Sequence, residues 1–353
     1  MYYLKPLYIS FLILALNLFF FSTTYVLAKS FQVNEIEISE PFKEKFNKND
    51  VIDKGFKKSF FELLNSLVKS SDFEKIKKIQ LNEIKSMIES FTIKEEKFVD
   101  QTYFLKMGVN FDKRKIYNFL EKKNIFPSQI KHQKFLFLPI LIDENNNKII
   151  LYSDNPIYKK WNVDNSKNYL IEFLLPTEDL EDLNYISSKI DDIENYDFDE
   201  IVKKYYLENF IISLFYKNNN DIKILSKIYI KDKEIIINNL FQNYNLNEEK
   251  ELFGFINELK TIYEDLWKEQ NQINTSIKLP LMIRINNQNL KDSIKFENTI
   301  SEIDLISYYS VKNFNKKHIY YEIIFNGTPN NFIKLMSEKN YNLDTQNKIW
   351  ILQ

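Results

Sequence analysis

The chain has 353 residues, of which 44% are hydrophobic and 16% aromatic, and it carries a formal net charge of -1. A disordered chain would be poorer in apolar side chains and richer in uncompensated charge, so we expect a folded protein of two or three domains. Because the sequence has no cysteine, disulfides, thiolate zinc sites, iron–sulfur clusters and a cysteine nucleophile are excluded. The near-neutral charge gives no reason to expect nucleic acid as a partner, since that would need a strongly basic face.

The first 28 residues are typical of a secretory signal peptide. Lys5 supplies positive charge, an apolar run extends over residues 7–21, and a small-residue cleavage signal ends at Ala28. We therefore expect cleavage between Ala28 and Lys29 and export to the periplasm. The alternative is an uncleaved helix that anchors the chain in the inner membrane, although a run of about 15 residues is shorter than the roughly 20 that span a bilayer. No later segment reaches spanning length, so we expect no membrane span once the signal peptide is removed.

Residues 31–125 have the pattern of an α+β domain. Apolar and polar residues alternate over 31–38 and, most clearly, over 103–111, which predicts two half-buried strands. Between them, apolar residues recur at spacings of three and four over 52–67, which predicts a helix with one buried stripe.

Residues 130–245 predict a three-layer α/β domain. The continuous apolar run over 135–142 is typical of a strand that is covered on both faces. Further buried strands are expected over 169–175 and 209–216, and strands nearer an edge over 222–237. Helical stretches separate the buried strands, which is the pattern of an α/β sheet with helices on its faces.

The last third of the sequence predicts a connecting helix over 247–273 and then a small domain over 279–353. The expected order within 279–353 is strand, helix, strand, strand, helix, strand, which is the ferredoxin-like arrangement. The final strand, over 348–353, should pair inside the sheet, because an apolar terminal strand would otherwise leave backbone groups unpaired.

After the signal peptide, the strand and the long helix, four segments follow in order. They are FTIKEEKFVDQTYFLKMGVNFD (91–112), FLFLPILID (135–143), NPIYKKW (155–161) and LLPTEDLEDL (174–183). Together they resemble the bacterial family called domain of unknown function 2066, over about residues 31–245, although the chain lacks that family's Ala- and Arg-rich first helix. The resemblance implies an exported envelope protein and supplies no catalytic residues. The matching positions, all of unknown role, are Glu96, Lys97, Tyr103, Val109, Phe111, Pro139, Asn155, Pro156, Trp161, Pro176, Asp179 and Asp182.

The middle domain is also similar, more loosely, to small α/β domains of envelope adaptors such as the N-terminal domain of the Tol translocation protein. Those domains bind other proteins, so the resemblance implies another envelope protein as a partner. This is an analogy of fold, which constrains function only weakly.

The residues that usually carry catalysis are scarce. The only histidines, His132 and His318, each stand among lysines, without a neighbouring carboxylate to orient the ring. The four glycines stand far apart, so no nucleotide-binding loop is possible. We therefore predict no catalytic residue, no cofactor and no metal site.

Two charged stretches are candidate sites. Ten carboxylates lie over 178–200, where Asp179 and Asp182 could together start a helix. This stretch could also bind a divalent cation or dock a basic partner, but the glycine of a Ca²⁺ loop is missing. A basic stretch could contact an anionic surface, form a solvated helix face or pair with the acidic stretch; it contains Lys113, Arg114, Lys115, Lys122 and Lys123.

The sequence as a whole predicts an exported envelope protein that acts through protein contacts without catalysis. The alternative is a periplasmic hydrolase or carbohydrate-active enzyme that uses a carboxylate pair, with Asp179 and Asp182 as its candidates. Such a pair would need a cleft and two separated pKa values.

Overall fold

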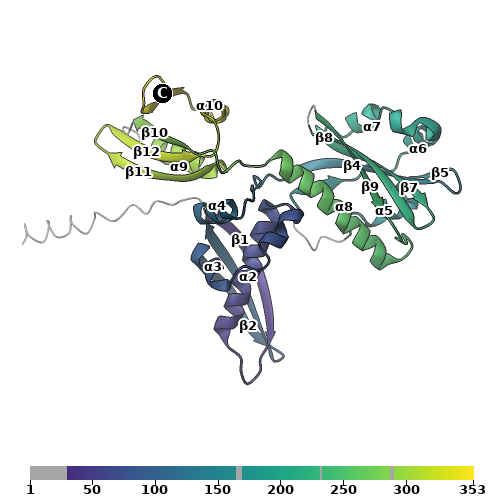
Figure 1. The fold of residues 1–353 in the computed structure, drawn as a ribbon, viewed down its shortest axis with the longest axis horizontal. Coiled ribbons are helices and arrows are strands. Elements are labelled where there is room, and N and C mark those ends of the chain that lie inside the picture. Colours follow the sequence, from purple (N-terminus) through teal and green to yellow (C-terminus); the bar gives the residue numbers. More distant parts are fainter. Residues whose placement is uncertain (1–29, 164–168, 231–232, 287–289) are drawn as a thin grey trace, which may run out of the picture.

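A computed structural model describes residues 30–163, 169–230, 233–286 and 290–353 (Figure 1). The predicted signal peptide, with its cleavage site at Ala28 and Lys29, lies outside the described residues. The fold is mixed α and β, with three separate sheets. We refer to residues 30–125, 130–270 and 279–353 as the first, middle and C-terminal parts.

The first part is an antiparallel sheet of order β1-β3-β2 with a long helix packed on one face. Both predicted strands and the helix are present, and Asn47 caps the helix by accepting a hydrogen bond from the Asn49 N–H at 3.0 Å. Strand β2 was not predicted, because most of its side chains are exposed and its sequence shows no alternation of apolar and polar residues. The elements are β1 (Ser30–Pro41), α2 (Lys48–Leu67), the 3-10 helix η1 (Ser70–Lys75), α3 (Leu81–Met87), β2 (Ile88–Val99), β3 (Thr102–Asp112) and α4 (Lys113–Lys122).

The middle part is a six-stranded mixed sheet of order β5-β4-β7-β8-β9, with β6 pairing in parallel to β4. The elements before β7 are β4 (Gln133–Asp143), β5 (Lys148–Ile150), η2 (Tyr152–Asp154), α5 (Pro156–Lys160), β6 (Ile171–Leu174), α6 (Leu180–Ser187), η3 (Ile190–Asn195) and α7 (Asp199–Lys203). The remaining elements are β7 (Asn209–Asn218), β8 (Asp221–Ile230), β9 (Lys233–Phe241) and α8 (Glu249–Gln270).

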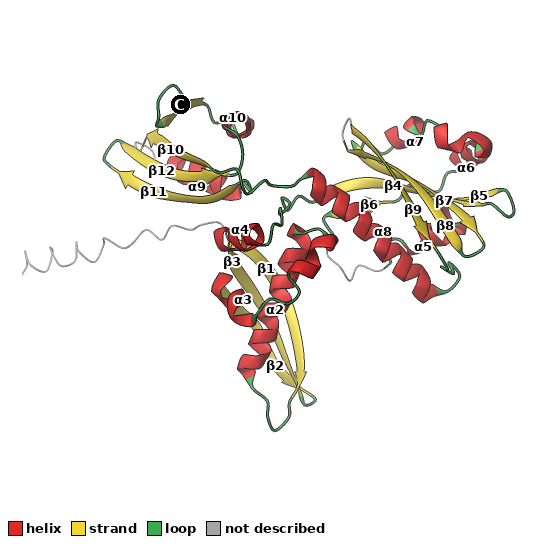
Figure 2. Ribbon diagram, in the orientation of Figure 1, coloured by secondary structure: helices red, strands yellow, loops and turns green. Residues whose placement is uncertain are grey.

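Helices cover both faces of the middle sheet (Figure 2). Successive residues of β4 point into opposite clusters: Phe135 and Phe137 pack towards α5 and α8, whereas Leu136 and Leu138 pack towards α6 and α7. The continuous apolar run over 135–142 therefore reflects burial of β4 on both faces of the sheet, as predicted.

The helix expected over 247–273 as a connector is α8, and it belongs to the middle core. Its apolar stripe, including Phe255, Leu259 and Tyr263, packs on the sheet. The Tyr263 hydroxyl also lies within hydrogen-bond distance of the buried Ser213 and Ser226 hydroxyls, at 2.7 and 2.8 Å. An isolated tether could not bury such a stripe, so the helix packs against the nearest open sheet face.

The C-terminal part is a five-stranded sheet of order β11-β12-β10-β14-β13, with α9 and α10 packed on one face. As the sequence predicts, the final strand pairs inside this sheet, in parallel with β10; the short β13 on its other side was not predicted. The elements are β10 (Leu279–Asn286), α9 (Leu290–Glu302), β11 (Ile306–Phe314), β12 (His318–Phe325), α10 (Pro329–Glu338), β13 (Leu343–Asp344) and β14 (Trp350–Leu352).

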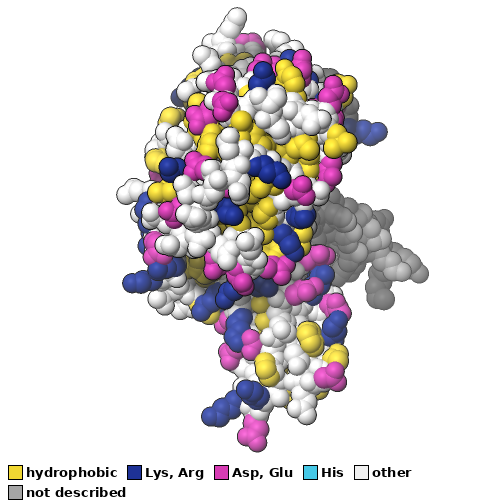
Figure 3. Space-filling view, turned by 90° about the vertical axis from the view of Figure 1, so that its right-hand side faces the viewer, with side chains coloured by type: hydrophobic (Ala, Val, Ile, Leu, Met, Phe, Trp, Pro, Cys, Tyr) yellow, Lys and Arg dark blue, Asp and Glu magenta, His cyan; other side chains and the backbone are white. Residues whose placement is uncertain are grey.

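Seen from the side of the middle part, hydrophobic and charged side chains are interspersed over the surface, and the narrow end of the first part projects below (Figure 3). Among the residues that the structure describes, no helix combines the length and the apolar composition that crossing a membrane requires.

Candidate functional site

Five of the twelve family-like positions meet in one packing cluster of the middle part. The fully buried Asn155 donates a hydrogen bond from its side-chain amide to the Pro139 carbonyl at 3.1 Å and accepts one from the Ile157 N–H at 2.9 Å. Pro156 begins α5, where a missing backbone N–H costs nothing. The Tyr158 hydroxyl donates to the Pro176 carbonyl at 2.7 Å. These positions join β4, α5 and the end of β6, which is a structural role.

Trp161 is the largest side chain of this cluster. It is fully buried and stacks on Phe137 with ring centroids 3.9 Å apart. The Lys260 ammonium of α8 lies 5.5 Å from the centre of the Trp161 ring and 5.6 Å from that of Tyr169, within the range of a cation–π contact. Trp161 therefore links the core to a charged position that lines a cleft described below.

Glu96, Lys97 and Tyr103 lie in the first part, away from that cluster. Glu96 pairs with Lys48 at 2.7 Å and Lys97 with Glu95 at 3.0 Å, all with exposed side chains. The hydrogen bond from Lys48 lowers the pKa of Glu96, and burial raises the pKa of Tyr103 to about 12. Exposed pairs of this kind add little stability. Lys97 and Glu95 also line a concavity of about 350 Å³ beside Lys106.

Asp179 and Asp182 are brought together, but by a lysine. Asp179 caps α6, and the Lys204 ammonium lies 3.0 Å from Asp179 and 2.8 Å from Asp182. The hydrogen bond from Lys204 lowers the pKa of Asp179, so this carboxyl stays ionised and is poorly suited to donate a proton. In the described part of the chain, no three His, Asp or Glu side chains are placed to share a metal ion.

The basic stretch divides on folding. Lys113 is 1% exposed, and its ammonium donates to the Ile303 carbonyl at 3.1 Å, so this residue cannot reach an external anion. The Arg114 guanidinium lies 5.1 Å from the centre of the Tyr308 ring, and the Lys115 ammonium donates to the Ser86 carbonyl at 2.9 Å. Lys122 and Lys123 remain exposed at the end of α4.

A cleft of about 910 Å³ lies between the first and middle parts. One wall is residues 32–37 of β1 with part of α2, and the other is β6 with the neighbouring segment 130–132. Lys260 of α8 also lines the cleft, as does His132. Both β1 and β6 are edge strands, each paired on one side only. None of the predicted site residues lines this cleft.

The edge of β6 that faces the cleft is capped by side chains at its two ends. The backbone N–H of Gln133 in β4 donates to the Leu170 carbonyl at 2.9 Å. In a parallel pair, alternate residues point their backbone groups towards the neighbouring strand, so those of Ile171 and Phe173 face away from β4. The Ile171 N–H donates to Glu264 at 3.3 Å, and the Asn162 amide donates to the Phe173 carbonyl at 3.0 Å. Among the described residues, the Ile171 carbonyl and the Phe173 N–H between these caps have no hydrogen-bond partner.

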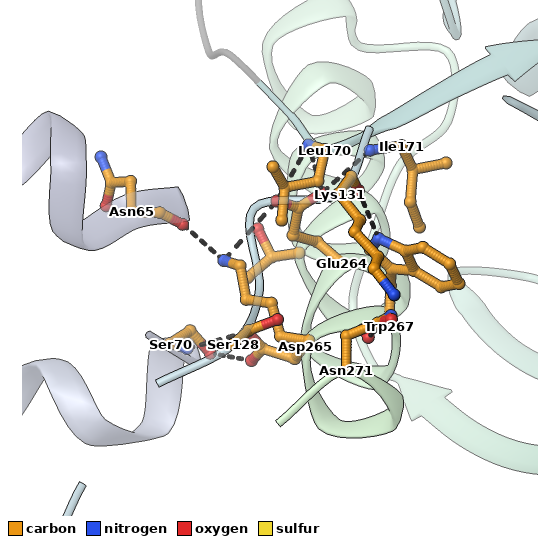
Figure 4. Close-up of polar contacts among 12 residues, drawn as sticks. Asn65, Ser70, Ser128, Lys131, Leu170, Ile171, Glu264, Asp265, Trp267 and Asn271 are labelled. Carbon is orange, nitrogen blue, oxygen red and sulfur yellow. Dashed lines mark hydrogen bonds and ion pairs between the residues drawn. The ribbon is translucent and has the colours of Figure 1, made fainter. Parts of the chain in front are cut away.

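Glu264 belongs to a buried polar network that joins the first and middle parts (Figure 4). Its carboxylate also accepts from the Leu170 N–H at 2.9 Å and lies 3.6 Å from the Lys268 ammonium, with both side chains about 5% exposed. Lys268 donates to the Asn65 carbonyl at the end of α2, at 2.6 Å. Asp265 accepts from the backbone N–H and hydroxyl of Ser70. Burial raises the pKa of Glu264 and lowers that of Lys268.

A sequence signal for this network exists and was missed. Lys260, Glu264 and Lys268 recur every four residues within α8, so they lie along one side of the helix. The predicted apolar stripe of this helix includes Tyr263, which precedes Glu264 in the sequence. Charged residues bordering a buried stripe indicate either a solvated boundary or a buried pair, and the periodicity alone does not separate these two cases.

The chain matches no protein-family model, and a comparison with curated proteins finds no significant relative.

Proposed function

We propose that this chain is an exported cell-envelope protein that acts by holding a partner protein in the cleft between its first and middle parts, without catalysing a reaction. The observation that carries the proposal is a pair of backbone groups on β6, the Ile171 carbonyl and the Phe173 N–H, for which the described residues provide no partner and whose residues line this cleft. A strand edge with free backbone groups is a template for another polypeptide. A polypeptide supplies the matching N–H and carbonyl from its own backbone and extends beyond them along the cleft, so it fits this site.

The finer architecture is part of the same proposal. We assign an α+β domain to 31–125, a three-layer α/β domain to 130–245 that α8 completes, and a ferredoxin-like domain to 279–353. The strand order β11-β12-β10-β14, with two helices on one face, supports the last assignment. We also propose that the chain is related to the domain of unknown function 2066 family, on the sequence resemblance given above.

Export rests on the sequence of residues 1–28. We expect protein recovered from the periplasmic fraction to begin at Lys29, because Val26-Leu27-Ala28 presents small or short residues to signal peptidase. Intact-mass measurement tests this expectation. A mass that retains residues 1–28 would favour the membrane-anchored alternative.

The function is tested by photocrosslinking in the native envelope. The crosslinker p-benzoylphenylalanine replaces Glu172, an exposed residue of β6 that lines the cleft. A matched variant carries it at Lys339, an exposed residue after α10. We expect a discrete protein adduct from the position at Glu172 and none from the position at Lys339. Equal labelling at both positions, or no adduct at either, contradicts the proposal.

A further inference from the structure

We propose that the occupant of the cleft is an extended peptide segment with basic side chains, which adds in parallel to the free edge of β6. This inference rests on the proposed function and specifies its ligand class and binding mode. It depends on the capped edge of β6, the length of the groove and the charge of its walls.

The capping pattern defines what can pair with β6. Glu264 occupies the Ile171 N–H and Asn162 occupies the Phe173 carbonyl, whereas no described residue bonds to the Ile171 carbonyl or the Phe173 N–H, and both residues line the cleft. In a parallel ladder one residue of the incoming strand donates to the first of these groups and accepts from the second. A single residue of a parallel segment therefore satisfies both open groups, and it continues the parallel pairing that β6 already makes with β4.

The same caps limit how the segment is recognised. Only two main-chain hydrogen bonds are available on β6, so side-chain contacts with the rest of the cleft must contribute to binding. The opposite wall follows residues 32–37 of β1, which a bulge at Asn34 and Glu35 interrupts and which span at most about 20 Å at about 3.3 Å per residue. A groove of this length between two strands fits an extended chain better than a compact ligand.

The charge of the lining favours a basic segment. Four carboxylates line the cleft, from Glu35, Glu37, Glu62 and Glu172, against two lysines. Glu35, Glu37 and Glu172 have side chains that are 64%, 71% and 67% exposed. Glu172 pairs with the exposed Lys134, and Glu35 and Glu37 share the half-buried Lys106 at 3.6 and 3.4 Å. Because the three carboxylates themselves are exposed, solvent screens these pairs. Incoming lysine or arginine side chains at alternate positions can therefore compete for these carboxylates.

The test uses the mature full-length protein and a short fluorescent peptide of alternating Lys and Val, read by fluorescence anisotropy. Two further peptides carry N-methyl groups either on every Lys or on every Val, and a fourth replaces Lys with Glu. In an added strand, alternate residues direct their backbone N–H groups to the edge, and N-methylation removes these donors. We therefore expect one of the two N-methylated peptides to bind about tenfold more weakly than the parent peptide and the other to bind as tightly as the parent. The Glu peptide should not bind.

Protein variants separate charge from folding. Glu37→Lys should weaken binding of the Lys peptide several-fold, whereas Glu338→Lys makes the same charge change on the exposed end of α10 and should leave binding unchanged. Circular dichroism verifies that both variants are folded. Equal binding of both N-methylated peptides and the parent overturns strand addition, and binding of the Glu peptide overturns the basic ligand class. If no peptide binds while the crosslink from the position at Glu172 persists, this inference fails and the proposed function stands.

Discussion

The first part of the chain is joined to the middle part and to the C-terminal part by two junctions that are built differently. Towards the middle part, Glu264 and Lys268 are buried together and each also bonds to backbone groups of other segments. Towards the C-terminal part, Lys113 alone is buried, against the Ile303 carbonyl and, at 3.7 Å, the Asp304 carboxylate, which is 19% exposed. The Tyr117 hydroxyl adds a bond to the Asp304 carbonyl at 3.2 Å.

The difference indicates how firmly each junction holds. A buried ion pair with further hydrogen bonds is costly to break, because removing one partner leaves an uncompensated charge in the interior. At the other junction Lys113 faces a carbonyl and the Asp304 carboxylate, which is 19% exposed, so removing the lysine leaves a carboxylate that solvent still reaches. We therefore expect the cleft to keep its shape and the C-terminal part to be the more easily displaced, which the following variants test.

The largest effect is expected for Lys268→Met. This change leaves the Glu264 carboxylate buried without its cation and should lower the free energy of unfolding by about 3–5 kcal/mol. Urea denaturation measures it. The matched control is the double variant Glu264→Gln/Lys268→Met, which removes both charges and should recover part of the loss. A double variant less stable than the single one would contradict the assignment of a coupled buried pair.

Lys113→Met should cost less, about 1.5–3 kcal/mol, the range for a hydrogen bond made by a charged group. Its effect should also be local, because Ile303 and Asp304 directly precede β11. We expect faster amide hydrogen exchange in β11 than in β4. Lys122→Met, at an exposed position of the same helix, is the control. Unchanged exchange in β11 would show that Lys113 does not hold this junction.

The pH dependence of the middle junction has a defined sign. Burial raises the pKa of Glu264, so the folded protein binds this proton at a pH where the unfolded chain has released it. Stability from this group therefore increases as the pH falls from neutral towards about 4, the usual pKa of a glutamate. The stability of the wild type relative to Glu264→Gln should rise over that interval in urea titrations. A relative stability that falls instead would indicate a lowered pKa.

The smallest effect is expected for Lys204→Met, about 1 kcal/mol in a urea titration. Lys204 bridges the exposed Asp179 and the largely buried Asp182 from a side chain that is 45% exposed, so solvent screens part of the attraction. The pKa of Asp179 is lowered, so its contribution is present above about pH 4 and is lost as the pH falls through the lowered value. Lys203→Met, which removes the exposed pair with Asp199 at 2.8 Å, is the matched comparison. A large loss for Lys204→Met alone would mean that the pair is far less screened than its exposure implies.

The elements that could be predicted from the sequence are those in which buried residues recur at a regular spacing. Strand β3, the apolar strand β4, the stripes of α2 and α8 and the order of the longer strands and helices from Leu279 onward could be predicted, because local hydrophobic spacing reflects which side is buried. The two-residue strand β13 could not. The sequence also determined the exclusion of all cysteine chemistry. Strand β2 could not be found this way, since most of its side chains face solvent.

Which charged side chains are buried, and where the cleft forms, depend on tertiary contacts between distant segments. The periodicity of α8 does not show that Glu264 and Lys268 are buried, because burial of a charge depends on the distant segments that bond to it, here Leu170 and Asn65. The isolation of Lys113 from solvent depends in the same way on Ile303. The cleft lies between strands that are more than a hundred residues apart in sequence, which contacts such as that between Lys268 and Asn65 hold together.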